Sequence, residues 1–386
     1  MRKLSNMSLL VLMSLFILLE QSSLAAVKNV IILIGDGMGF EQVKAASLFG
    51  YGQEGSLSFE QYYRGELATH SANSYLSRDH ATDSAAAATA MATGQKVNND
   101  VVSEDANEPL KTILEYSQER GKATGLVTTV PATHATPAGF GAHNITRNNF
   151  RDIAEDYLNQ SRPNILFSTY LANESGITPR KARLTGYTVA KTRREMQDMV
   201  EMADNNFEGN VFLAGLFMPG DDLPYEYDYY RQTRMLFPYE GINLLSYDVI
   251  PHLSEMTSTA LSILDNDPDG FFLMVEGGSI DHAGHSNIIE RNVYATLEFD
   301  EVCKVVFDWA ENREDTLVVI AADHETGWLK VIQGKGRGIM PEVFWGSGGH
   351  SGANVPVYAT GQGAEEFVGV MDNTDIFNII MKLTNE

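Results

Sequence analysis

Short apolar runs alternate with amphipathic stretches along most of the chain. The runs are nearly continuous in apolar residues, which is typical of strands buried on both faces of a sheet: 29–37, 123–130, 210–217, 271–278, 316–323 and 355–361. The stretches between them have apolar residues at helical spacing, as in 112–120, 254–264, 288–310 and 374–383. This alternation predicts an α/β fold, a three-layer sandwich with a central, mostly parallel sheet covered by helices on both faces.

The N-terminus has the pattern of a secretory signal peptide over residues 1–25. Arg2 and Lys3 precede the apolar run 9–19, and Ser23-Leu24-Ala25 offers a small-x-small cleavage site. The run is short for a membrane span, so an uncleaved anchor is the less favoured alternative. We therefore expect a mature chain without a membrane span, exported to the periplasm or secreted.

Residues 26–386 are predicted to form a single domain with a surface insertion around 180–245, which contains the acidic, aromatic stretch 220–241. The formal net charge of -23 argues against binding of nucleic acid through the overall field of the protein. An anionic substrate would need local positive charge, from metal ions or a well-placed arginine. The only cysteine, Cys303, excludes an internal disulfide, and we interpret it as a small buried apolar residue.

Acidic residues and histidines follow several of the predicted strands: Asp36, Glu276, Asp281, His282, His285, Asp323, His324 and His350. Taken singly, an aspartate at a strand end usually caps the next helix, and a lone histidine is usually an ordinary polar residue. Sites in parallel sheets form beyond the carboxyl ends of the strands, however. Mixed Asp and His ligands suit zinc, and sites richer in carboxylates suit magnesium.

The stretch "DHATDSAAAATAMATG" (79–94) predicts a helix of small residues that begins at Ser84. Thr82 or Asp83 can cap it, which leaves the Ser84 hydroxyl at the positive end of the helix dipole. An unactivated serine is a weak nucleophile, but a divalent cation at its oxygen could activate it. The alternative is a plain helix start with a buried alanine face. The chain lacks the Gly-x-Ser-x-Gly elbow of Ser-His-Asp hydrolases.

Six motifs in order resemble those of the alkaline phosphatase family: "ILIGDGMG", "DHATDSAAAATA", "HATPAGFGAHNITR", "EGGSIDHAGH", "AADHETG" and "GGHSG". The resemblance extends from about Asn29 to the C-terminus. One signature position differs, since Ala81 stands where the family usually has Val or Ile, and this is a packing position. The resemblance implies a catalytic domain that hydrolyses phosphate monoesters through a phosphoserine, with two Zn²⁺ ions, one Mg²⁺ ion and a homodimeric assembly.

The resemblance also implies a role for each candidate residue. Ser84 would be the nucleophile, and Arg147 would clamp two phosphate oxygens. The first zinc would be held by Asp281, His285 and His350. The second would be held by Asp36, Asp323 and His324, with Ser84 as the remaining ligand. The magnesium would be held by Asp36, Thr136 and Glu276. His134 and His282, which are Asp and Lys in some bacterial members, would be neighbours of this third site.

Two other functions remain open from the residues. A phosphodiesterase of the same superfamily would usually have a threonine nucleophile and no counterpart of Arg147. A non-catalytic, metal-stabilised binding protein would need neither Ser84 nor Arg147. A sulfatase would need a cysteine or serine in a modification motif that the sequence does not contain.

Overall fold

The computed structural model describes residues 27–76, 80–106, 108–170, 176–206, 211–217 and 251–385. The predicted signal peptide and the stretch 220–241 lie outside these residues. No helix within the described ranges is long and apolar enough to cross a membrane.

The core of the fold is one twisted, 10-stranded sheet with the order β16-β2-β15-β10-β1-β9-β5-β6-β8-β7. Its strands are β1 (Asn29–Gly35), β2 (Tyr63–Ala68), β5 (Ala123–Pro131), β6 (Ile165–Thr169), β7 (Thr188–Ala190), β8 (Leu213–Phe217), β9 (Phe271–Gly277), β10 (Thr316–Ala321), β15 (Val355–Gly361) and β16 (Gly369–Asp372). From β10 through β1, β9, β5, β6 and β8 to β7 every pairing is parallel. β15 runs antiparallel to both of its neighbours, β10 and β2.

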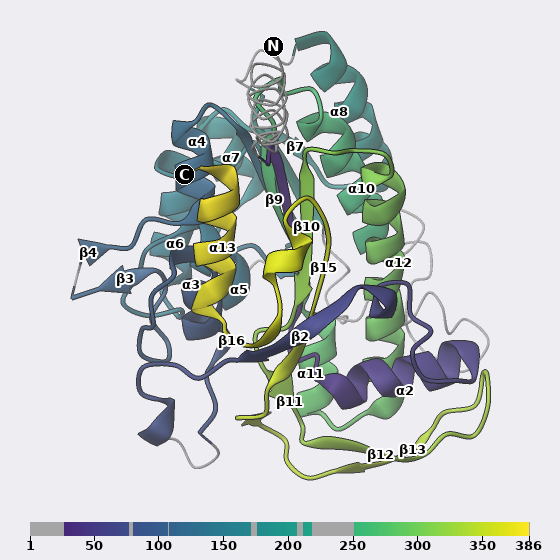
Figure 1. Cartoon of the computed structure of the whole chain (residues 1–386). Coiled ribbons are helices and arrows are strands. Elements are labelled where there is room, and N and C mark those ends of the chain that lie inside the picture. Colours follow the sequence, from purple (N-terminus) through teal and green to yellow (C-terminus); the bar gives the residue numbers. More distant parts are fainter. Residues whose placement is uncertain are drawn as a thin grey trace, which may run out of the picture.

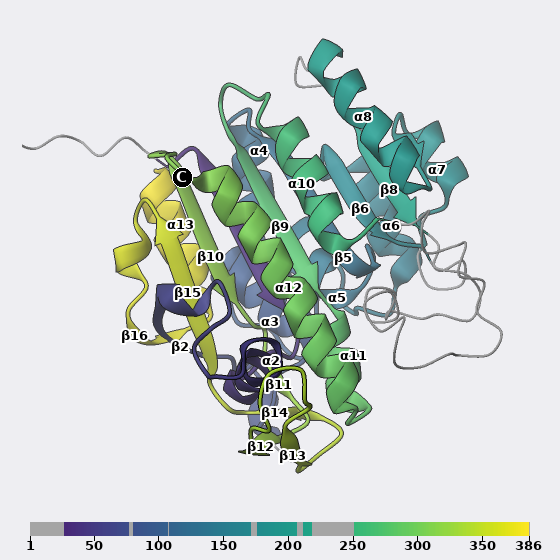
Figure 2. The same cartoon turned by 90° about the vertical axis from the view of Figure 1, so that its right-hand side faces the viewer.

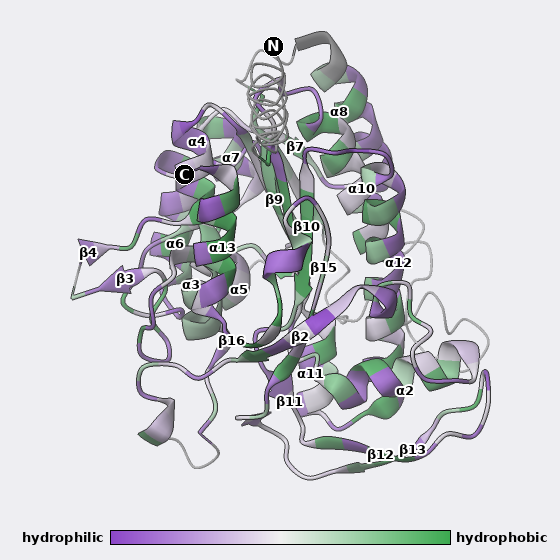
Figure 3. Ribbon diagram, in the orientation of Figure 1, coloured by the Kyte–Doolittle hydropathy of each residue, from purple (hydrophilic) through white to green (hydrophobic). Residues whose placement is uncertain are grey.

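Helices cover both faces of this sheet (Figures 1 and 2). One layer contains α3 (Ser84–Thr93), α4 (Ile113–Glu119), α5 (Ala135–Gly141), α6 (Phe150–Asn159) and α13 (Thr374–Thr384). The other contains α2 (Phe40–Tyr51), α8 (Arg193–Asn206), α10 (Leu253–Leu264), α11 (Ser279–His285) and α12 (Ile289–Ala310). α7 (Pro179–Leu184) lies near the β7 edge. Every residue of β1, β9 and β10 is buried, and these strands are largely hydrophobic (Figure 3).

Three small ladders stand outside the main sheet: β3 (Glu104–Asp105) with β4 (Glu108–Pro109), β11 (Glu325–Thr326) with β14 (His350–Ser351), and β12 (Leu329–Gln333) with β13 (Glu342–Trp345). Single 3₁₀ turns occupy Glu60–Tyr62, Ser74–Leu76 and Ala364–Glu366. The β11–β14 ladder carries one sequence candidate, His350, and pairs it with the residues that directly follow His324.

The predicted fold class is confirmed, and each predicted strand and helix has a counterpart within a few residues of the expected bounds. The strands β2, β6, β7 and β16 were not predicted. β6, β7 and β16 are short, and β2 begins with two exposed residues and then alternates between buried and half-buried ones, so none of them forms a long apolar run. The antiparallel direction of β15 was not predicted either, because a buried run has no direction in the sequence.

The surface insertion expected around 180–245 needs a correction in its first part. β7 pairs with β8, and β8 pairs with β6, so both strands extend the main sheet. All five residues of β8 are buried, which is why this segment belongs to the core rather than to an excursion. A surface insertion stays a proposal only for residues beyond 217, which the structure does not describe up to 250.

The alanine-rich helix α3 is buried along its whole length, which explains its composition. It crosses α5 so closely that a Cβ built on Gly139 would lie 2.6 Å from Ala88 Cβ. Larger residues on either helix would push the two backbones apart. The small residues therefore let α3, which begins at Ser84, pack directly against α5, which carries Thr136.

We predict that Gly139→Val destabilises the protein by about 1–3 kcal/mol, because the added side chain overpacks this contact. Urea unfolding followed by circular dichroism measures the difference. Ser262→Val, on the exposed face of α10, is the control and should change stability by less than about 0.5 kcal/mol. Equal stability of the two variants would mean that α3 and α5 are not in close contact.

Candidate active site

The central parallel strands bring their carboxyl ends to one edge of the sheet, and the acidic candidates lie there. Asp36 directly follows β1, Glu276 is near the end of β9, and Asp323 follows β10. β1 lies between β9 and β10, with Ile34 opposite both Glu276 and Ala321. The side chains of all three acidic residues are almost completely buried. Residues far apart in the chain thus form one buried acidic cluster.

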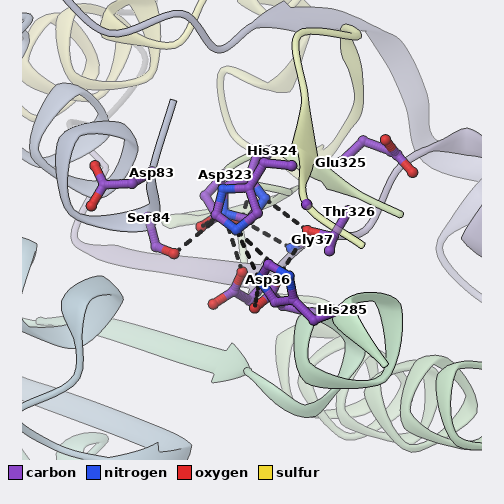
Figure 4. A network of polar contacts seen from close by, with 12 residues as sticks. Asp36, Gly37, Asp83, Ser84, His285, Asp323, His324, Glu325 and Thr326 are labelled. Carbon is purple, nitrogen blue, oxygen red and sulfur yellow. Dashed lines mark hydrogen bonds and ion pairs between the residues drawn. The ribbon is translucent and has the colours of Figure 1, made fainter. Parts of the chain in front are cut away.

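Asp36, Asp323 and His324 form one candidate metal group. His324 Nε2 lies 3.1 Å from Asp323 Oδ2 and 3.5 Å from Asp36 Oδ1. The same nitrogen lies 3.2 Å from Ser84 Oγ. Figure 4 shows Ser84 pointing from the start of α3 toward His324. The structure therefore brings together all four residues that the resemblance assigns to the second ion.

Asp281, His285 and His350 also meet. His285 Nε2 lies 3.1 Å from His350 Nε2 and 3.3 Å from Asp281 Oδ2, and His350 Nε2 lies 3.6 Å from Asp281 Oδ1. The His324 ring stacks on the His350 ring with 3.5 Å between centroids. The group around Asp281 that has the spacing of a metal site is Asp281, His324 and His350, so His324 lies between the two sets of ligands.

A third group combines Asp36 and Glu276 with His134. The Thr128 hydroxyl donates a hydrogen bond to Glu276 Oε2. Burial raises the pKa of Glu276 to about 7, and the hydrogen bond from Thr128 partly offsets this effect. The His134 ring stands edge-on to the His282 ring, with 5.8 Å between centroids. Both histidines thus lie at the third group, and His134 is placed closely enough to be a ligand.

The acidic cluster has the electrostatics of a cation site. Both carboxylate oxygens of Asp36, Asp323 Oδ2 and Glu276 Oε1 are buried and accept no hydrogen bond. Burial, together with the nearby Asp323, Asp281 and Glu276 carboxylates, raises the pKa of Asp36 well above its usual value. Buried carboxylates are costly unless opposite charge compensates them. Bound cations would supply that charge, and the Asp and His donors fit zinc, whereas Asp36 and Glu276 also suit magnesium.

Arg147 lies beside the nucleophile candidate. Its Nη1 donates to Asp83 Oδ2 at 3.0 Å, and its Nη2 lies 3.5 Å from His134 Nε2. Asp83 Oδ1 also accepts a hydrogen bond from the Ala86 N–H at 3.1 Å, so Asp83 is the N-cap of α3. One carboxylate thus caps the helix that presents Ser84 and holds the arginine next to it. The sequence suggested the cap but gave no signal for the ion pair.

The chain matches the family model described as alkaline phosphatase over residues 27–175, 180–343 and 340–385. It is 31% identical to Alkaline phosphatase 3 of Bacillus subtilis, over 92% of this chain and 88% of that protein. It is 29% identical to the streptomycin-6-phosphate phosphatase of Streptomyces griseus, over 94% of this chain and 91% of that protein.

Solved structures are similar over a comparable length. The alkaline phosphatase of the Antarctic bacterium TAB5 superposes with a TM-score of 0.72 and 26% identity, covering 93% of this chain and 99% of that chain. The cold-active enzyme of a Shewanella species gives a TM-score of 0.74 and 25% identity, covering 93% of this chain and 100% of that chain.

We predict that metal removal lowers the thermal stability of the protein, because the acidic cluster loses its compensating charge. At a free metal concentration of 100 times Kd, a bound ion contributes about 2.7 kcal/mol to folding. Calorimetry with EDTA, and again after zinc and magnesium are restored, measures the change. Asp36→Asn should lose less on chelation, because one buried charge is absent. An unchanged melting temperature of the parent on chelation would contradict metal binding.

Proposed function

We propose that Ser84 is the nucleophile of this chain, which belongs to the alkaline phosphatase family. Members of this family, and this chain with them, hydrolyse phosphate monoesters with the help of metal ions. The observation that carries the proposal is the 3.2 Å separation of Ser84 Oγ from His324 Nε2, inside the group formed with Asp36 and Asp323. Ser84 also occupies the first position of α3, where the helix dipole favours a developing negative charge.

We assign the three groups to two zinc ions and one magnesium ion. The first zinc would be bound by Asp281, His285 and His350, and the second by Asp36, Asp323, His324 and Ser84. Asp36, Glu276 and Thr136 would hold the magnesium. When bound, these ions would favour the deprotonated forms of serine and water and would neutralise charge on the phosphoryl group.

The resemblance to the family implies that members differ at the third group. Two structures of the Antarctic enzyme are of variants in which a histidine is replaced by aspartate or by glutamate, with magnesium bound in a site called M3. In this chain His134 offers one ligand atom that lies within 4.8 Å of a carboxylate oxygen of Asp36 and of Glu276. We propose that this is the corresponding site, and that imidazole in place of carboxylate weakens its preference for magnesium.

The proposed reaction uses the chain's own groups in the following roles. Ser84 Oγ attacks phosphorus in line with the leaving oxygen, so that one P–O bond forms as the other breaks and an alcohol departs. Water attacks the phosphoserine from the vacated side and releases phosphate. Arg147 binds two equatorial oxygens, which a planar guanidinium does bidentately. Asp83 holds the arginine in reach before substrate arrives.

The biological setting is also a proposal. The N-terminal pattern of residues 1–25 supports export to the periplasm or the medium, followed by removal of that segment. The resemblance to the family supports a homodimer. The net charge of -23 supports small phosphate monoesters as substrates rather than nucleic acid, since the overall field of the protein repels a polyanion.

We predict that Ser84→Ala forms no phosphoenzyme that survives acid quenching and loses on the order of 10³-fold or more in kcat, because the acceptor oxygen is gone. Zinc content should persist, since Asp36, Asp323 and His324 remain. Labelling with radioactive phosphate measures the first effect, and elemental analysis measures the second. Ser262→Ala is the control and should label normally. Label on the Ser84→Ala protein would assign the nucleophile elsewhere.

Replacing Arg147 by alanine should weaken phosphate inhibition and raise KM for monoesters by about ten- to a hundredfold, the value of a charged hydrogen-bonded contact. Activity on a diester should fall less, because a diester has fewer free charged oxygens to clamp. Steady-state kinetics on both substrates tests this, with the exposed Arg151→Ala on α6 as control. Equal losses on the two substrates would refute the clamp.

The double variant His134→Asp, His282→Lys should depend more strongly on magnesium and have a changed affinity for phosphate. Carboxylate is a harder ligand than imidazole and favours magnesium over zinc or cobalt. Activity titrations with the three metals measure the preference, and phosphate inhibition measures the second effect. If the variant has the same metal response and inhibition constant as the parent, these histidines do not act on the third site.

A further inference from the structure

The hydroxyl of Thr326 contacts one residue from each of the two proposed zinc groups. Its Oγ1 donates to Asp281 Oδ1 at 2.5 Å and lies 3.2 Å from His324 Nδ1. Asp281 belongs to the first group and His324 to the second. Thr326 is completely buried, was not among the sequence candidates, and lies two residues after His324 in the "AADHETG" motif.

We propose that Thr326 is a positioning residue that couples the two groups through the chain of hydrogen bonds His324 Nδ1–H to Thr326 Oγ1–H to Asp281 Oδ1. The inference rests on the proposed function, because it takes these two groups to be ion sites. It assigns to one neutral side chain the task of orienting a ligand of each ion.

The direction of the hydrogen bonds follows from the surroundings of His324. Its Nε2 faces Asp36, Asp323 and Ser84, which is the side of the second ion. Figure 4 shows Thr326 on the other side of the ring from Ser84. If Nε2 offers its lone pair to the ion, Nδ1 carries the proton and must donate it.

The single hydroxyl proton of Thr326 is then available only for Asp281. An ionised carboxylate can only accept a hydrogen bond, so the short contact to Asp281 Oδ1 uses the threonine proton. Thr326 Oγ1 therefore accepts from His324. His324 donates, Thr326 accepts from it and donates in turn, and Asp281 accepts. A change in the position of His324 would therefore alter the hydrogen bond to Asp281, and the reverse also holds.

The backbone of Thr326 is fixed by three neighbouring segments. Its N–H donates to Gly37 O at 3.2 Å, and its carbonyl accepts a hydrogen bond from Gln42 Nε2 at 2.8 Å. It also pairs with His350 in the β11–β14 ladder. Gln42 is completely buried on α2 and also donates to Glu325 Oε1 at 2.9 Å. Segments that carry Asp36 and His350 thus hold the residue that orients Asp281 and His324.

The side chain of Thr326 is enclosed as closely as its backbone. A Cβ built on Gly37 would lie 2.8 Å from Thr326 Oγ1, and one built on Gly284 would lie 3.0 Å from Thr326 Cγ2. Both branches of the side chain therefore have a neighbour that only glycine leaves room for. A rotamer locked in this way is what a group needs in order to orient others within a narrow angle.

Removal of the Thr326 hydroxyl should lower the affinity of the protein for both zinc ions together. The buried Nδ1–H of His324 would lose its acceptor, and Asp281 Oδ1 would lose its donor. Loss of a partner that orients a ligand typically costs about 10- to 100-fold in metal affinity. Substitution of a residue that only fills space would not lower the affinities for two separate ions by a comparable factor.

Three variants of Thr326 separate the hydroxyl from the methyl group. Thr326→Val keeps the shape and loses the hydroxyl, and Thr326→Ser keeps the hydroxyl and loses the methyl. Thr326→Ala loses both, so its comparison with Thr326→Ser isolates the hydroxyl even if the valine variant does not fold. Thr257→Val, at a buried threonine on α10 whose hydroxyl bonds to Leu253 O, is the control away from the site.

The experiment titrates full-length, metal-loaded protein with a zinc chelator of known affinity and measures zinc retained per chain. We expect Thr326→Val and Thr326→Ala to lose both zinc ions at about tenfold or more lower chelator activity than the parent. Thr326→Ser and Thr257→Val should stay within about threefold of it. The visible spectrum of the cobalt-substituted protein should change in the valine variant and not in the serine variant, because ligand orientation alters the metal absorption.

The outcomes that would overturn the inference are distinct. Zinc retention in Thr326→Val or Thr326→Ala equal to that of the parent would show that the hydroxyl orients nothing. A serine variant as weak as the alanine variant would show that methyl packing is what matters. Loss of one ion alone would exclude coupling. A parent protein that binds no zinc would instead refute the proposed metal groups themselves.

Discussion

Buried negative charge at the carboxyl ends of three adjacent strands is the constraint on which the rest of the site depends. Asp36, Glu276 and Asp323 are placed together by the parallel order of β9, β1 and β10, and no lysine or arginine is among the buried residues in the part of the chain that the structure describes. Arg147 lowers the pKa of Asp36, but this effect is smaller than the rise that burial and the neighbouring carboxylates cause. Stability and chemistry are therefore linked, since the cations that would offset this charge are those that phosphoryl transfer requires.

Small residues around the buried acidic cluster allow the elements that carry the site residues to pack closely. Gly139 and Ala88 let α3 and α5 approach closely, which brings the helix that begins at Ser84 against the helix that carries Thr136. Gly37 and Gly284 leave room for Thr326 between the two groups of ligands. At each of these contacts a small residue allows two backbone segments to approach closely. Each contact lies in or next to an element that carries a proposed ligand or the nucleophile.

The same arrangement explains how an acidic protein can act on an anionic substrate. The net charge of -23 would repel phosphate at long range, but salt screens such charges beyond about 8–10 Å. Within the site the balance is set by the proposed ions and by Arg147, which Asp83 already holds in place. The surface charge then concerns solubility, whereas the site sets the affinity for phosphate.

The sequence by itself determined the fold class, the strands buried on both faces and the start of α3 at Ser84, because these depend on local composition and on spacing along the chain. It also identified the proposed ligands, by strand ends and by resemblance. Only the tertiary structure decided the direction of β15, the strands β2, β6, β7 and β16, and the contacts of Asp83 with Arg147 and of Thr326 with Asp281. Those features join residues that are distant in the chain and polar or small, and such residues leave no periodic pattern from which their partners could be predicted.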